Sequence, residues 1–116
     1  MSTWSVKDSL ELYNVNHWSG GFFSINEEGN VEARPDRAHS IDLTKLAASL
    51  KQQDIPFPTL VRFPNILHSR INKITSSFHD AIEFYQYQGD YSIVYPIKVN
   101  LQRRVVEEII GFQKDN

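Results

Sequence analysis

The sequence predicts an α/β fold, because short apolar runs and helical patterns alternate through the second half of the 116-residue chain. Residues 59–63 and 91–99 are runs typical of strands, and a helical pattern follows each of them. This order is typical of parallel sheets. The run at residues 91–99 is apolar at both sets of alternating positions, as in strands covered on both faces. Two such strands cannot complete a parallel sheet, so we expect the chain to be the front part of a larger fold.

The first third of the chain predicts a β-hairpin. Its two extended segments are residues 21–26 and 30–34, and the loop between them contains Gly29. Pro35 and Asp36 are turn-forming residues that end the second segment.

Asp42 is a candidate N-cap for a short helix, because the apolar residues after it have the spacing of one helical face. These residues are Leu43, Leu46, Ala47 and Leu50. Residues 55–58, Ile-Pro-Phe-Pro, end the helix, because proline lacks an amide donor and restricts the residue before it. We therefore predict an N-terminal hairpin-plus-helix segment at residues 1–57 and a second segment at residues 58–116.

Two helices are predicted in the second segment. From Asn65 onward, apolar residues recur at steps near three and four until residues 88–90, Gln-Gly-Asp, as in a long amphipathic helix. Asn100 is a candidate cap for a last helix, with Gly111 as its end or weak point. The apolar residues of this last helix are Val105, Val106, Ile109 and Ile110.

Composition argues against several classes of partner. Lys and Arg number 12 against 14 Asp and Glu, for a formal charge of −2, so no field favours nucleic acid or anionic lipid. No stretch approaches the roughly 18 apolar residues of a membrane helix, and the N-terminus lacks the pattern of a secretory signal. The absence of cysteine excludes disulfides and thiolate metal sites. We expect a cytoplasmic protein without nucleic-acid or membrane partners.

Lys98 is the residue of greatest chemical interest, because it is a single cation near the end of the apolar run. A desolvated lysine has a larger fraction of neutral amine, which attacks aldehydes to form a Schiff base. Pyridoxal phosphate is the common protein-bound aldehyde used in this way. The simpler alternative is a strand lysine that keeps its ammonium in water or protects a sheet edge. The strand pattern alone does not separate these two interpretations.

The wider sequence resembles the biosynthetic arginine decarboxylases, pyridoxal-phosphate enzymes of the alanine-racemase-like barrel class. Residues 94–100, Val-Tyr-Pro-Ile-Lys-Val-Asn, and residues 102–109, Gln-Arg-Arg-Val-Val-Glu-Glu-Ile, are similar to the segment that carries the cofactor lysine in that family. Further similar strings follow the same order from about Tyr13 to Ile110. They are residues 13–18, 21–26, 58–63, 66–71 and 78–96. Leu101 departs from the family pattern, where we expect glutamine.

The resemblance implies that residues 58–116 begin a (β/α)8 barrel, incomplete in this chain, that binds pyridoxal 5'-phosphate. Lys98 is then both the catalytic and the cofactor-binding residue, at the C-terminal end of the first barrel strand, where barrel active sites lie. The implied enzyme is a lyase of polyamine and spermidine biosynthesis that converts L-arginine to agmatine and CO2. The family also implies Mg2+, whose ligands the sequence does not reveal, and a homo-oligomer at full length. An unclosed barrel predicts that the 116-residue chain alone is inactive.

Other polar residues have simpler interpretations. His68 and His79 lie on one predicted helix about 16 Å apart, too far for one metal ion, and His17 and His39 form no short ligand pair either. Glu107 and Glu108 point about 100° apart on a helix, so we expect a solvated face. Four arginines are expected in surface or interface ion pairs, although one pair lies near a helix N-terminus where phosphate can bind. They are Arg62, Arg70, Arg103 and Arg104.

Pro96 predicts a strand irregularity that aims Lys98, or else an edge position that needs no amide donor. Two functional alternatives to the decarboxylase also remain open. One is another pyridoxal-phosphate barrel, such as a racemase-like or cofactor-carrying protein. The other is a catalytically dead fragment that acts only as an interaction or oligomerisation module.

Overall fold

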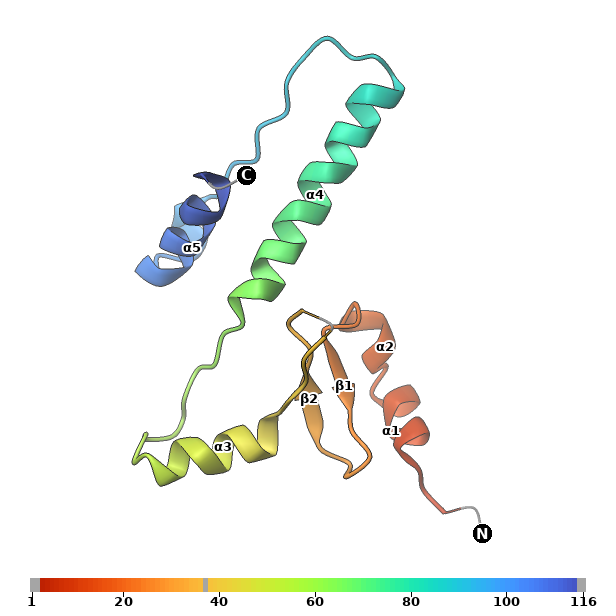
Figure 1. Cartoon of the computed structure of the whole chain (residues 1–116), viewed down its shortest axis with the longest axis vertical. Coiled ribbons are helices and arrows are strands. Elements are labelled where there is room, and N and C mark those ends of the chain that lie inside the picture. Colours follow the sequence, from red (N-terminus) through yellow and green to blue (C-terminus); the bar gives the residue numbers. More distant parts are fainter. Residues whose placement is uncertain (1–2, 37, 115–116) are drawn as a thin grey trace. The chain divides into compact units, whose positions relative to one another are not determined.

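The computed structural model describes the backbone of residues 3–36 and 38–114. The chain forms two compact units, Met1–Phe63 and Pro64–Asn116, and Figure 1 shows the elements of each. The first unit contains helices α1 (Val6–Leu12), α2 (Val15–Trp18) and α3 (Leu43–Gln52) with strands β1 (Phe23–Ile25), β2 (Val31–Ala33) and β3 (Ile41–Asp42). The second contains α4 (Pro64–Phe84), the 3-10 helix η1 (Ile97–Val99) and α5 (Arg103–Lys114). The chain is thus a mixed helix-and-strand structure.

The predicted hairpin is confirmed. Strands β1 and β2 pair antiparallel with Ser24 opposite Glu32. Their turn is closed by Asn26, whose side-chain oxygen accepts hydrogen bonds from the amides of Glu28 and Asn30. Gly29 has a φ of 81°, which costs glycine little because it lacks a Cβ. Strand β3 then adds to the other edge of β2, also antiparallel, and was not predicted because two residues carry no periodicity.

The N-terminal helices precede the hairpin and were not predicted either. Ser5 and Asp8 form a capping box at the start of α1, with each side chain bonded to the other residue's backbone amide. The indole nitrogen of Trp18 donates to the carbonyl of Tyr13 at 3.1 Å, and its ring lies 5.7 Å from that of Phe23. The hydrogen bond thus joins α2 to the C-terminal end of α1, and the ring contact joins α2 to β1.

Asp42 caps α3 as predicted, and it also fixes the hairpin turn. Its Oδ1 accepts from the amides of Thr44 and Lys45 at 2.8 and 3.1 Å. Its Oδ2 accepts from the side-chain amides of Asn30 and Asn26 at 3.0 and 2.9 Å. These donors, with Asn30 the strongest, lower the pKa of Asp42 to about 2. One carboxylate therefore joins the start of α3 to the turn between β1 and β2.

The predicted strand at residues 59–63 is wrong. This stretch has no regular secondary structure, and Leu60 is exposed. Prolines at 56, 58 and 64 remove amide donors around it, and no described strand runs beside it to form a ladder. The long helix after it is confirmed as α4, although it ends at Phe84, before residues 88–90.

The predicted strand at residues 91–99 is also wrong for this chain. Residues 91–96 have no regular secondary structure, and Ile97–Val99 forms η1. The sheet that the structure describes contains three antiparallel strands, all in the first unit, so the expected parallel alternation is not observed. A strand needs a neighbour for its backbone hydrogen bonds, and among the described residues none lies beside this segment. Helix α5 is confirmed, and it continues past Gly111.

The core of the second unit lies between α4 and α5. Ile71, Val105 and Ile109 are its buried residues. Leu67, Tyr95 and Phe112 pack against them. Through Tyr95, this small core contacts one side of the segment that carries Lys98.

Candidate functional site

Residues 91–101, which we call the lysine segment, run back along α4 after the chain turns beyond its C-terminal end (Figure 1). Tyr91, Ile93 and Tyr95 are half-buried, whereas Ser92 and Val94 between them are exposed. The ring of Tyr91 stacks on Phe78 of α4, with centroids 4.1 Å apart and planes 6° apart. One alternating row of side chains therefore faces the helices and the other faces away.

Lys98 is exposed and lies in the middle of η1. The amide of Val99 donates to Pro96, and the amide of Asn100 donates to Ile97, so the turn is closed around the lysine. Pro96 is the N-cap residue of this 3-10 turn, and because no strand forms here, the predicted strand irregularity and its edge alternative stay untested. Lys98 offers an accessible amine on the face of a turn, not a buried one inside a strand.

Asn100 fixes the chain immediately after Lys98, but not as the predicted helix cap. Its Oδ1 accepts from the amide of Gln102 at 3.1 Å, and the carbonyl of Gln102 accepts from Val105 at 2.9 Å. Since α5 begins at Arg103, Asn100 forms an Asx turn in front of the helix, and Gln102 occupies the N-cap position. This side chain therefore adds to the backbone hydrogen bonds that link η1 to the start of α5.

His68 and Glu108 are brought together across α4 and α5. Nε2 of His68 lies 3.2 Å from a carboxylate oxygen of Glu108, and the imidazole stacks on Phe112 at 4.4 Å. The nitrogen is buried, and its angle to the carboxylate is not that of a hydrogen bond. Glu108 is therefore an inter-helix contact and not wholly the solvated residue we expected. Glu107 is solvated as expected, in an exposed ion pair with Arg103.

The remaining histidines form no metal site. His39 pairs with Asp36 at 2.7 Å, His17 is in the last turn of α2, and His79 is exposed on α4. Within residues 3–36 and 38–114, no group of three or more His, Asp or Glu side chains could hold a metal ion.

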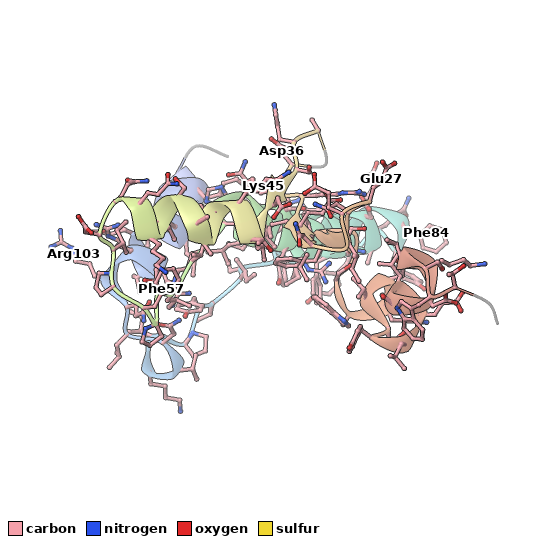
Figure 2. All side chains as sticks on the ribbon, turned by 90° about the horizontal axis from the view of Figure 1, so that it is seen from below. Glu27, Asp36, Lys45, Phe57, Phe84 and Arg103 are labelled. Atoms are coloured by element: carbon pink, nitrogen blue, oxygen red, sulfur yellow. The ribbon has the colours of Figure 1, made fainter. Side chains whose placement is uncertain are left out.

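A second polar cluster lies in the first unit, beside the hairpin turn (Figure 2, where Lys45 and Glu27 are labelled). Lys45 pairs with Glu28 at 3.0 Å, which raises the pKa of Lys45. Glu32 is buried and accepts from Nε of Arg34 at 2.8 Å. The printed ion pairs of this cluster thus lie within the first unit, joining Lys45 to Glu28 and Arg34 to Glu32.

No family model matches the chain, but two curated relatives are similar to nearly its whole length. A biosynthetic arginine decarboxylase from Shewanella frigidimarina is 49% identical over 117 residues, covering 98% of this chain and 18% of that protein. One from Shewanella loihica is also 49% identical, over 97% of this chain and 18% of its own length. None of the described helices is both long and apolar enough to cross a membrane. The predicted resemblance is confirmed: nearly the whole chain is homologous to biosynthetic arginine decarboxylases, and it spans 18% of their length.

Proposed function

We propose that this chain is the N-terminal portion of an arginine decarboxylase and that Lys98 is its cofactor-binding and catalytic residue. The similarity at 49% identity supports the family, and the string around Lys98 supports the residue. In this proposal residues 91–99 are the first strand of a (β/α)8 barrel, and α4 and α5 are helices of its outer ring.

The alternation of the lysine segment is the observation that carries the proposal. Tyr91, Ile93 and Tyr95 face the helices, as the outward row of a barrel strand does. Continuing this alternation in an extended chain puts Lys98 in the opposite row, with Val94. That row lines the interior of a barrel, and the C-terminal end of the strand carries active-site residues. In this arrangement Lys98 faces the barrel interior and lies at the C-terminal end of the strand, as the chemistry requires.

Pyridoxal phosphate, when bound, supplies an electron sink for the loss of CO2 from arginine. Lys98 would hold the cofactor through its Nζ, at the position for which the amino group of arginine would compete. Asn100 keeps the lysine at the strand end through its bond to Gln102.

The partners follow from the same assignment. The substrate is L-arginine, the product agmatine enters polyamine synthesis, and the complete enzyme is a cytoplasmic homo-oligomer that also uses Mg2+. We propose that ligands of the metal lie further along the full-length chain; among the described residues no group of three or more His, Asp or Glu side chains could hold an ion.

A chimaera tests the proposal. In it, this chain replaces the matching segment of the S. frigidimarina decarboxylase, and agmatine formation is measured. We expect activity in the chimaera and a loss of at least about 1,000-fold in Lys98→Ala, because the cofactor attachment is removed. Lys51→Ala, an exposed lysine on α3, is the matched control and should keep full activity. Equal activity of the two variants would reject the role of Lys98.

A further inference from the structure

His68 carries a buried nitrogen at the junction of α4 and α5. Among the described residues, its Nε2 has no hydrogen-bond partner, although the side chain as a whole is 28% exposed. A buried polar atom without a partner costs free energy, so its position needs a physical reason. The proposed decarboxylase chemistry makes no use of this imidazole.

The group that faces this nitrogen is a carboxylate from the other helix. An oxygen of Glu108 lies 3.2 Å from Nε2, which is hydrogen-bonding distance, but the angle is not that of a hydrogen bond. The imidazole lies flat on Phe112, with planes 12° apart, so the ring has little freedom to turn. The side chain of Glu108 is 45% exposed, and its carboxylate is therefore the part that can move into line.

Few other charges surround this pair. On α5, Arg104 lies one turn before Glu108 on the same face, whereas Glu107 points about 100° away. The lysine segment contributes the phenol of Tyr95, which packs on the neighbouring core. The residues of α4 that lie one turn from His68 are all uncharged: Pro64, Asn65, Ile71 and Asn72. Glu108 is thus the carboxylate that a positive charge on the imidazole meets.

Protonation of His68 makes this contact charge-assisted. A neutral imidazole carries hydrogen on one of its two nitrogens, whereas the imidazolium carries hydrogen on both. The N–H at Nε2 then faces a negative oxygen, and charge-assisted hydrogen bonds are about twice as strong as neutral ones. Burial opposes a charge on the ring, but Glu108 keeps part of its hydration and the face of Phe112 attracts a cation. The protonated form therefore gains more from the contact than the neutral form.

We propose that His68 and Glu108 form a proton-dependent latch between α4 and α5, which closes as the pH falls through the range near about pH 6.5 in which imidazole titrates. The latch lies beside the core between these helices, because Phe112 both stacks on His68 and packs against that core. Tyr95 of the lysine segment packs on the same core. Closing the latch therefore steadies the support of the lysine segment at mildly acidic pH. The inference does not depend on the proposed decarboxylase, since it uses contacts within this chain alone.

Hydrogen exchange of the 116-residue chain, measured by mass spectrometry, tests the latch. Protection factors of the α5 amides are compared at about pH 5.5 and about pH 7.5, on either side of the imidazole range, after correction for the intrinsic exchange rate at each pH. We expect protection about five-fold higher at the lower pH, because the stronger contact makes α5 open less often. Equal protection at the two pH values, or greater protection at the higher one, would overturn the proposal.

Two variants separate the latch from other effects of pH. Glu108→Gln keeps the shape of the side chain and removes its charge, so the ratio of protection between the two pH values should fall close to one. His79→Asn removes the other histidine of the second unit, which is exposed on α4, and should keep the ratio of the parent chain. A ratio that survives in Glu108→Gln, or one that is lost in His79→Asn, would overturn the proposal.

Nitrogen NMR of the parent chain gives a readout that does not depend on the folding of any variant. The chemical shifts of the two ring nitrogens report how many of them carry hydrogen. We expect the His68 ring to carry hydrogen on both nitrogens at about pH 5.5 and on one at about pH 7.5. A ring that stays neutral at the lower pH would overturn the latch.

Discussion

The hairpin and the lysine segment both have the composition of strands, yet only the hairpin forms them. Strands β1 and β2 pair across a turn closed by Asn26 and Gly29, and Asp42 fixes that turn from outside. The lysine segment has α4 and α5 on one side and, among the described residues, no strand beside it. A β-strand forms only when a second segment pairs with it. Alternating apolar residues therefore predict that a segment can pair, but they do not show that a partner is present.

Removing the core beneath the lysine segment should have the largest effect on stability. Ile109→Ala deletes a buried side chain between α4 and α5, at a cost of about 2 to 5 kcal/mol. We expect faster hydrogen exchange throughout α4 and α5, with the hairpin amides unchanged. Ile110→Ala, at a position 48% exposed, is the control and should change little. Equal effects of the two substitutions would contradict the assigned core.

Asp42→Ala should destabilise the hairpin and the start of α3. It removes two bonds to the amides of α3 and two to the asparagines of the turn. Loss of a helix cap typically lowers Tm by about 5 °C in a domain of this size. The Tm is measured by thermal unfolding, with hydrogen exchange of the hairpin amides as the signal. Asp80→Ala, an exposed aspartate on α4, is the control, and a lower Tm for that variant than for Asp42→Ala would contradict this account.

Tyr91→Ala should loosen the lysine segment without unfolding the helices. The stacked pair with Phe78 contributes about 1 kcal/mol, so exchange of residues 91–95 should become faster in the free chain. Tyr87→Ala, at a position 65% exposed, removes a similar ring without that contact. If both variants exchange alike, the segment is not held by this stack.

The smallest expected effect is the change in the stability of the hairpin with pH. Because the pKa of Asp42 is lowered from 3.8 to about 2 in the folded chain, its contribution is complete above about pH 4 and is lost as the pH falls towards 2. Unfolding by urea, measured across this interval, should become easier in the parent chain. Asp42→Asn should show a shallower slope over the same interval, and an unchanged slope would contradict the role of the carboxylate.

Local signals predicted most of the helices and the hairpin. The Asp42 cap, the spacing of apolar residues in α4 and α5, and Gly29 in its turn are each determined by neighbours in the sequence. Helix α1 was missed although Ser5 and Asp8 carry its signal, and β3 was too short to give one. The two wrong strands depend on distant partners, which periodicity cannot report.

The candidate site was predictable only in part. Lys98 was chosen as the candidate from its neighbouring residues, and that choice stays a prediction; its exposed turn and the Asx turn of Asn100 were not predicted. The contact of His68 with Glu108 joins residues that are far apart in the sequence, so only the structure reveals it. A short sequence motif is enough to select a candidate residue. The environment of that residue depends on the rest of the fold and has to be taken from the structure.

Reductive trapping tests the central claim most directly. The chimaera is incubated with pyridoxal phosphate, reduced with borohydride and digested, and the peptides are mapped by mass spectrometry. We predict that the added mass lies on the peptide containing Lys98 and that this label is absent from Lys98→Ala. A label on another lysine of the active chimaera, with Lys98 unmodified, would contradict the account.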